Sequence, residues 1–112
     1  MAAGTVHVPW YATLFRGDDL AEALAEVGPT ALRYGATDFQ VERSKEDSYR
    51  FIQHAAFESK VDFEAWWYGP EMIDFRTRYS SHYQVPVVYE WWDRLASGAI
   101  PSADGEAAER AI

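Results

Sequence analysis

The stretch of residues 59–83 constrains the fold of this chain more than any other part of its sequence. It has the pattern of an amphipathic helix that is interrupted at Gly69 and Pro70, because proline lacks the backbone donor and its ring clashes with the preceding turn. Ser59 is a good N-cap residue, and Asp62 completes an approximate capping box. We therefore predict two helical segments in one layer, which needs a broad apolar sheet to lie on.

Large apolar side chains recur at helical spacing on both sides of this break. They are Phe63, Trp66, Trp67, Met72, Phe75 and Tyr79. Asp74 and Arg78 are spaced i and i+4 on the opposite side of the second segment, and we expect them to form a pair that faces solvent.

The rest of the chain reads as four strands and one further helix. We predict strands at residues 7–15, 37–43, 49–57 and 85–92, and a helix that starts at Asp18, breaks at Gly28 and Pro29 and closes at Gly35. Pro9 should precede the regular pairing of the first strand, since proline is tolerated only at a strand start or at an edge. The order strand, helix, strand, strand, helix, strand is the ferredoxin-like arrangement of an α+β domain with a four-stranded antiparallel sheet. We assign residues 1–95 to this domain and residues 96–112 to a C-terminal tail.

Both faces of the predicted sheet carry apolar side chains. On the third strand the odd positions should face the helices, and these are Tyr49, Phe51, Gln53, Ala55 and Phe57. Two helices cover only one face of such a sheet, and the other face would then be polar. Instead it carries Tyr11, Phe15, Ile52, Val88 and Trp92. We therefore predict a homodimer in which a second copy covers this face; the C-terminal tail folded over the sheet is the alternative cover.

The composition excludes several classes of protein. A net charge of −8 argues against nucleic acid and anionic membranes as partners. The absence of cysteine excludes disulfides, thiolate metal sites and cysteine nucleophiles. No apolar run approaches the length of a transmembrane helix and the N-terminus lacks a signal-peptide pattern, so we expect a cytoplasmic protein. Aromatic residues make up 16% of the chain, and so many rings must pack densely, lie between subunits or line a cavity.

One stretch of the sequence resembles a known superfamily. A hydrophobic strand ends in Phe57, Glu58 and Ser59; a first helical turn with Phe63, Glu64, Ala65 and Trp66 follows; and an apolar-rich segment from Met72 to Phe75 comes after the break. This succession resembles the antibiotic biosynthesis monooxygenase superfamily of dimeric α/β-barrel proteins. The resemblance implies a ferredoxin-like subunit that pairs as a dimeric α/β barrel, with a pocket between the helices and the concave sheet. Members include cofactor-independent oxygenases that act on quinols or polyketide aromatics, haem-degrading enzymes, and proteins without assigned chemistry.

The haem-degrading branch of that superfamily is a poorer match. Its members use an Asn on the first strand, a Trp on the second helix and a His further along. Trp66 matches the Trp, but Arg76 stands ten residues on, and the first strand contains no Asn. We therefore do not expect haem degradation.

Two residues are candidates for catalytic roles. His54, in mid-strand, could bind a phenolic substrate or take its proton, since histidine titrates near neutral pH. The alternative for His54 is a hydrogen bond across the dimer seam. Arg76 borders the apolar stripe and could bind a substrate carboxylate or phenolate, or pair with an internal acid such as Glu90.

The candidate ligand-binding residues are aromatic or end in a polar group. Trp66, Trp67 and Tyr79 could line a slot for a flat ring system, with core packing as the alternative for Trp66. The polar ends of Tyr11, Gln53 and Tyr89 could enter the same cavity. The three histidines have no metal-ligand spacing, so we expect no metal. We also expect no cofactor, because the sequence has no flavin or nicotinamide motif, and in any oxygen chemistry the substrate would have to supply the electrons.

Two functions follow from this reading. The first is a dimeric, cofactor-independent monooxygenase with an aromatic-lined pocket, acting on an electron-rich aromatic or a quinol. The second is a non-catalytic dimeric module that binds a small apolar ligand or serves as an interaction scaffold.

Overall fold

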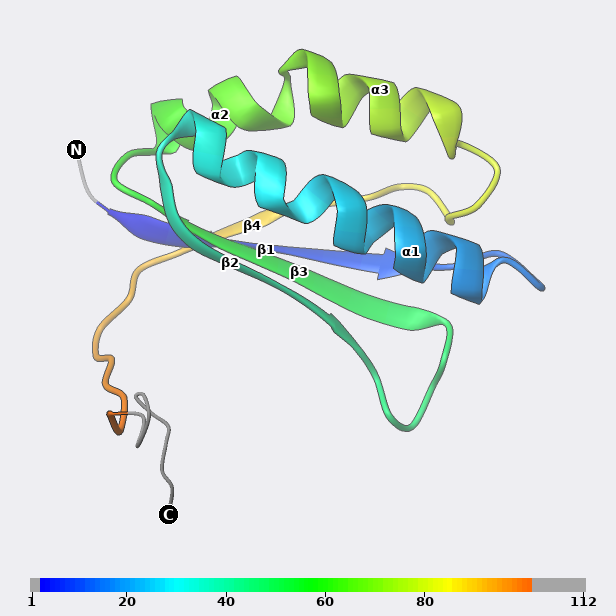
Figure 1. Ribbon diagram of the computed structural model, residues 1–112, viewed down its shortest axis with the longest axis horizontal. Helices are drawn as coiled ribbons and strands as arrows, with labels where there is room; N and C mark the ends of the chain where they lie inside the picture. The colour runs from blue at the N-terminus through cyan, green and yellow to red at the C-terminus, as the bar shows by residue number, and fades with distance from the viewer. Residues whose placement is uncertain (1–2, 102–112) are drawn as a thin grey trace.

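The computed structural model describes residues 3–101, and within them the elements follow the predicted order. They are β1 (Gly4–Tyr11), α1 (Gly17–Val27), the 3₁₀ helix η1 (Gly28–Tyr34), β2 (Ala36–Arg43), β3 (Arg50–Phe57), α2 (Lys60–Trp67), α3 (Pro70–Arg78) and β4 (Glu90–Trp92). The strands form one antiparallel sheet in the order β2-β3-β1-β4, and the helices lie together on one of its faces (Figure 1). The predicted ferredoxin-like α+β fold is confirmed.

Of the predicted tail, residues 96–101 are described without helix or strand, and residues 102–112 lie outside the described part. No helix within the described residues is long and apolar enough to span a membrane.

Both helices break where predicted, but Asp18 lies in the first turn of α1 and does not cap it, since the N-cap position is Arg16. The Ser59 hydroxyl accepts a hydrogen bond from the Asp62 amide at 3.2 Å, and Pro70 begins α3 directly after Gly69. A Cβ at Gly69 would lie 2.7 Å from the Ala65 carbonyl oxygen and 2.9 Å from the Tyr34 hydroxyl, so the bend admits only glycine without a shift of its neighbours. The first helix likewise changes to a 3₁₀ helix at Gly28, and Gly35 closes it with a φ of 96°.

The first strand differs from the prediction at both ends. It runs from Gly4 to Tyr11 rather than over residues 7–15, and Leu14 and Phe15 are 70% and 86% exposed in the turn that follows. The strand ends because Ala12 makes only an isolated bridge to Tyr83, and Phe15 takes a φ of 67°, which extended pairing does not allow.

The prediction for Pro9 was also wrong. Pro9 lies inside the strand, opposite Ile52 of β3. The Ala12 amide donates to the Tyr49 carbonyl oxygen on the β3 side, whereas the Thr13 amide donates to the His82 carbonyl oxygen on the other side. Alternate residues of a strand have the same orientation, so the Pro9 nitrogen points to the same side as the Thr13 amide, away from β3. On that side β4 pairs only as far as His7, and no ladder bond is lost at Pro9.

The fourth strand is much shorter than predicted. Only Glu90–Trp92 pairs with β1, whereas residues 84–89 run beside the sheet without a ladder. Pro86 in this segment and Pro9 on the facing edge both lack an amide donor, which explains why regular pairing does not extend there.

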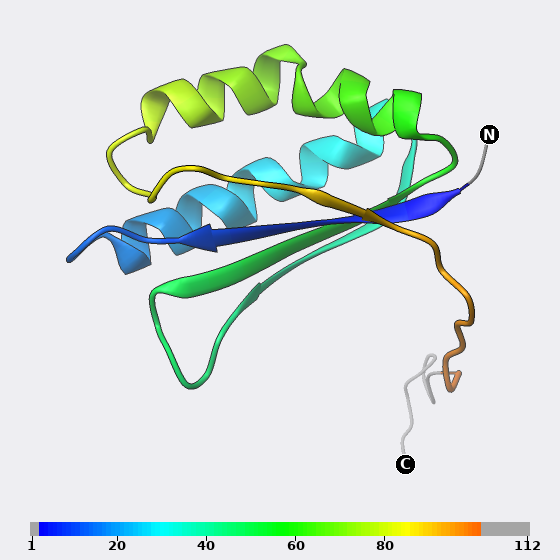
Figure 2. The same ribbon diagram turned by 180° about the vertical axis from the view of Figure 1, so that it is seen from behind.

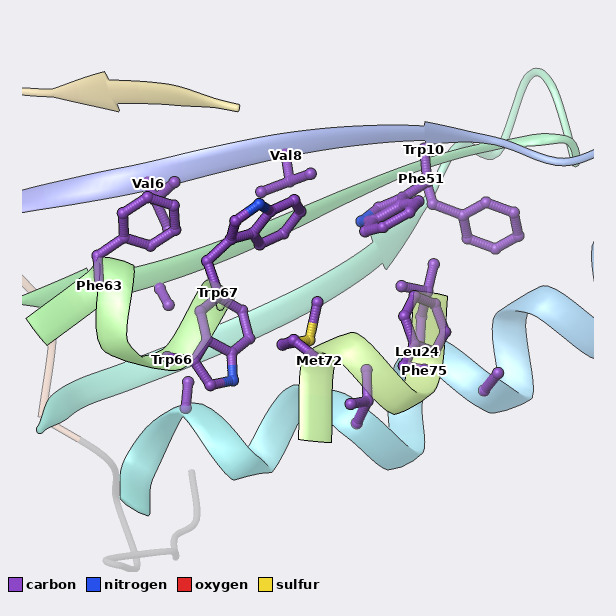
Figure 3. Packing of buried hydrophobic residues seen from close by; sticks show 14 of the residues in the cluster. Val6, Val8, Trp10, Leu24, Phe51, Phe63, Trp66, Trp67, Met72 and Phe75 are labelled. Carbon is purple, nitrogen blue, oxygen red and sulfur yellow. The ribbon is translucent and has the colours of Figure 1, made fainter. Parts of the chain in front are cut away.

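The core lies between the sheet and the helices. Figure 3 shows side chains from β1 and β3 meeting those of α1, α2 and α3 in one layer. The odd positions of β3 face this layer as predicted, since Phe51, Gln53, Ala55 and Phe57 are all buried. Trp10 joins them and meets Phe75 and Tyr83 edge to face, with centroid distances of 5.3 and 5.0 Å. The rings predicted on the broken helix therefore pack against the sheet.

Candidate functional site

Aromatic rings connect α2 with the segment 84–89 across one edge of the core. The Trp67 ring lies 6.1 Å from Trp10 and 5.6 Å from Tyr89, and Phe63 lies 4.7 Å from Tyr89. The two indoles of α2 diverge: Trp67 reaches toward β1 and Trp66 points toward η1 (Figure 3). The edge of the core beside Trp67 is thus walled by flat, polarisable surfaces, which suit the stacking of an aromatic ligand.

Gln53 places an unpaired donor in this wall. Its Oε1 accepts a hydrogen bond from Trp10 Nε1 at 3.0 Å, while its Nε2 is buried and has no partner. The residue is only 1% exposed, so bulk solvent does not reach this amide. A buried donor without a partner costs about 1–3 kcal/mol and calls for an explanation such as an absent ligand.

Arg76 supplies a second donor. Its Nη2 donates to the Trp67 carbonyl oxygen at 2.7 Å, and its guanidinium carbon lies 4.3 Å from the centroid of the Trp67 ring. Its Nη1 is buried and has no hydrogen-bond partner. Burial lowers the pKa of Arg76, yet an arginine stays protonated at neutral pH. The site therefore holds a fixed positive charge, and Arg76 Nη1 remains able to donate a hydrogen bond to a ligand.

Two tyrosines add uncharged polar groups to the site. The Tyr83 hydroxyl donates to the Arg76 carbonyl oxygen at 3.1 Å, and burial raises the pKa of Tyr83. Burial is the main cause that raises the pKa of Tyr89, and a hydrogen bond with Tyr68 raises it further. Both phenols remain protonated near pH 7 and can act as hydrogen-bond donors.

The structure brings together four of the predicted site residues: Gln53, Trp67, Arg76 and Tyr89. Gln53 contacts Trp10, Trp10 contacts Trp67, and Trp67 contacts both Arg76 and Tyr89. Trp66 neighbours Trp67, with 6.2 Å between ring centroids, but it is fully buried in the core and its Nε1 donates to Thr30 Oγ1 at 3.0 Å. Tyr79 borders the groove between α1 and α3 instead.

His54 and Tyr11 lie on the other face of the sheet. The His54 ring packs against the His7 ring at a centroid distance of 4.4 Å and a tilt of 50°, and its Nε2 is 3.4 Å from Glu42 Oε1. The Tyr11 hydroxyl donates to Asp47 Oδ2 at 2.6 Å, a bond that raises the pKa of Tyr11. Within one chain the sheet separates His54 from Arg76, so the two predicted catalytic residues do not share a site.

The alternative partner for Arg76 also lies elsewhere. Glu90 stands opposite His7 in the pairing of β1 with β4. Arg76 instead meets the carbonyl group of Trp67. No group of three or more His, Asp or Glu that could hold a metal ion occurs in residues 3–101.

Sequence reasoning did not select two residues of the wall, Trp10 and Tyr83. The alternation of the first strand already placed Trp10 on the helix side, which was the available signal. Tyr83 gave none, because its position depends on an isolated bridge to Ala12 that follows the turn after α3.

The site is lined with rings rather than hollowed out. The surface of the described residues includes four hollows, and none of these is lined by Gln53, Trp67 or Arg76. The largest, about 700 Å³, lies on the opposite face of the sheet, between Tyr11, the β2–β3 hairpin and residues 84–86. A ligand at the site would therefore have to displace Tyr89 or residues near it.

Solved structures with the same architecture were found. A protein from Nitrosomonas europaea provisionally assigned as an antibiotic biosynthesis monooxygenase has a TM-score of 0.75 at 17% identity, over 83% of this chain and 90% of that chain. A second provisionally assigned antibiotic biosynthesis monooxygenase, from Bordetella bronchiseptica, has a TM-score of 0.73 at 13% identity, over 86% and 100%. A Bacteroides thetaiotaomicron protein of unknown function, described as a possible oxidoreductase, has a TM-score of 0.70 at 10% identity, over 81% and 98%.

This chain has the fold of the antibiotic biosynthesis monooxygenase superfamily. The resemblance inferred from residues 57–75 is thereby confirmed at the level of fold. No family model matches the sequence, and no curated protein matches it. At these identities the likeness establishes the architecture and leaves the chemistry to be argued from the site.

Proposed function

We propose that the protein is a homodimer that binds a small electron-rich aromatic compound beside Trp67 and oxygenates it without a cofactor. The observation that carries this proposal is the pair of buried donors, Gln53 Nε2 and Arg76 Nη1, on one aromatic wall. Two unpaired N–H groups next to flat rings suit a ligand that combines a ring system with acceptor oxygens. Phenols, quinols and anthrones have this chemistry.

The fixed charge of Arg76 would activate such a substrate. A guanidinium beside a phenol or enol favours the anion, and the proton leaves to water. The anion is the electron-rich form that reacts with oxygen. For an anthrone-type CH₂ group, one oxygen atom of O₂ becomes the new carbonyl and the other leaves as water with the two hydrogens, so the substrate supplies all the electrons.

The homodimer is proposed from the sheet face that lacks helices. Tyr11 and Trp92 are 43% and 51% exposed there, beside the half-buried Ile52. Figure 2 presents the same arrangement from behind, with the helices again on one side of the sheet only. A second copy placed against this face would bury these side chains and close the barrel that the resemblance implies.

The second candidate function is ligand binding without turnover. It is favoured by the position of His54, because no histidine faces the site to take a proton from a weakly acidic substrate. A haem enzyme is not proposed, since Arg76 occupies the helix where an axial histidine would be needed.

Oxygen uptake tests the proposal. The native protein is incubated with a panel of hydroquinones and anthrones, and uptake is compared with that of Arg76→Met. We expect the loss of Arg76 to lower the rate about 10²–10³-fold, as for removal of a preorganised donor to an oxyanion.

The matched control is Arg78→Met, which removes an exposed arginine that pairs with Asp74 on the same helix. Its rate should equal that of the native protein. Uptake that is unaffected by Arg76→Met would refute the assigned role. Binding of panel compounds without any uptake would support the second candidate instead.

A further inference from the structure

The segment after β4, residues 93–101, leaves the body of the domain as an extended arm. Figures 1 and 2 both show it running off the sheet on the side away from the helices. Leu95 and Ile100 in this arm are 92% and 95% exposed, the highest values among the large apolar residues of the described chain. At the base of the arm Arg94 donates to Thr5 Oγ1 at 3.1 Å, but Leu95 and Ile100 are not covered by their own subunit.

A hollow of about 700 Å³ lies under the same face of the sheet, and we refer to it as the hairpin hollow. Its floor is formed by the end of β1 and the start of β3, with Pro9, Tyr11 and Ile52. Its two walls are residues 42–45 of the β2–β3 hairpin and residues 84–86. The bond from Tyr11 to Asp47 ties the hairpin to β1, so the hollow is already formed in the single chain.

The arm and the hairpin hollow lie at opposite ends of the sheet. β4 pairs with Thr5 to His7 and runs toward the start of β1, whereas the hollow is built at its end, on Pro9 to Tyr11. Figure 1 shows the arm and the hairpin projecting from the same face at these two ends. The chain direction therefore carries the arm away from the hollow of its own subunit.

A second copy removes this mismatch. When two sheets pack face to face about a two-fold axis that runs across the strands, the end of one sheet lies over the start of the other. Each arm then meets the hollow of the partner, and the contact occurs twice by symmetry. Fully extended, the arm spans about 30 Å, comparable with the length of β1 at about 3.3 Å per residue.

The two surfaces are also complementary in chemistry. The floor and one wall of the hollow offer Pro9, Ile52 and Val85 to the apolar side chains of the arm. Its rim includes the cations Arg43, Lys45 and Arg50 and the single acid Glu42, in a chain whose net charge is −8. A cationic rim on one copy would be attracted to a second copy, since each chain carries a net negative charge.

We propose that the arm, residues 93–101, seats in the hairpin hollow of a second copy, so that the two subunits exchange arms. This inference rests on the proposed homodimer and adds which segment covers which surface. The hollow then receives Leu95 and Ile100, and the arm is the peptide that fills it.

Cross-linking tests this directly, because the chain has no cysteine of its own. Full-length chains with Val85→Cys and chains with Ile100→Cys are mixed and treated with a short bismaleimide. Exchange predicts a covalent dimer on a denaturing gel from the mixture, and little from either chain alone. The control replaces Val85→Cys with Val61→Cys, which places an equally exposed thiol on α2, on the helix side of the sheet.

The double variant Val85→Cys/Ile100→Cys separates the arrangements. Exchange gives cross-linked dimers, whereas an arm that folds back gives an internally linked monomer and overturns the proposal. Sedimentation of the unmodified chain distinguishes failure of the arm exchange from failure of the proposed homodimer. A dimer without specific cross-links overturns the exchange alone, and a monomer at micromolar concentration overturns the dimer as well.

A charge in the arm gives a second test. Leu95→Asp together with Ile100→Asp should raise the dissociation constant of the dimer at least tenfold. An unchanged constant would overturn the exchange. Both residues are exposed in the single chain, so the substitutions should leave its folding intact, which circular dichroism checks.

Discussion

The two faces of the sheet differ in how completely one chain satisfies them. On the helix side Val6, Val8 and Trp10 are at most 2% exposed, and the rings of α2 and α3 pack against them. On the open side Tyr11 and Trp92 remain about half exposed, and His7 packs against His54 with tilted rings. On the helix side of the described residues two donors lack a partner, whereas the open side leaves large apolar side chains exposed. Two unpaired donors are few enough for a small ligand to satisfy, whereas a broad exposed apolar face fits the surface of another protein chain.

The largest effect on stability should come from removing a tryptophan on the helix side, and the matched comparison is removal of a tryptophan on the open side. Trp66→Ala deletes a fully buried indole and leaves a cavity, so the free energy of unfolding should fall by about 3–5 kcal/mol. Trp92→Ala should change the unfolding of a single chain far less, since half of that side chain is exposed. Urea titrations measure both. Equal losses would contradict the distinction between the faces.

A smaller effect is expected from Gln53→Leu. This change removes the unpaired Nε2 but also leaves Trp10 Nε1 without its acceptor, which costs about 1–3 kcal/mol. Gln53→Glu keeps an acceptor for Trp10 while it removes the donor, and serves as the comparison. If the donor binds ligand, both variants should lose affinity for the panel compounds, although only the first exchanges polar for apolar atoms. Retention of full affinity by both would remove Gln53 from the site.

The smallest effect is a dependence on pH that is confined to the open face. Burial and the nearby His54 lower the pKa of His7, with Glu90 acting in the opposite direction. The folded state therefore favours neutral His7, and its contribution is present above the ordinary pKa of histidine, about 6.5, and is lost as the pH falls through the lowered value. The groups around the pair are Glu42 on β2, Glu90 on β4, and Trp92, Asp93 and Arg94 in the adjoining hollow.

Thermal melts between pH 5 and 8 measure this dependence, and the loss of stability should begin as the pH falls below about 6.5. His7→Gln should flatten the acid side of the curve. His82→Gln, at the far end of the molecule near Asp19, should leave it unchanged. A steeper loss in His7→Gln than in the native protein would reverse the sign argued here.

The sequence predicted most of the fold because its strongest signals are local. Gly69 and Pro70 set the break between α2 and α3, Ser59 sets the start of α2, and alternation along β3 assigns its faces. The errors lie where pairing between distant segments decides. Whether Pro9 is tolerated depends on how far β4 extends, and that cannot be read from the strand that contains Pro9.

The candidate site was predictable in its residue types and less so in its partners. Arg76 and Gln53 were identifiable as polar groups beside an apolar stripe. Their contacts with Trp67 and Trp10 depend on side-chain geometry across α2, α3 and the sheet. The separation of His54 from Arg76 was contained in the parity of β3, since even positions face away from the helices.

The glycine at the bend between α2 and α3 has a consequence for the cation of the site. Gly69 lies against the Ala65 carbonyl and the Tyr34 hydroxyl, and that hydroxyl also donates to Glu71 in the first turn of α3. These contacts fix the direction in which α3 departs, and with it the aim of Arg76 over Trp67. The arginine is thus aimed by the backbone before any substrate arrives, and little freedom is left to lose on binding. Changes to the surrounding rings could therefore alter which ligand the site accepts without redirecting Arg76, as long as Gly69 is kept.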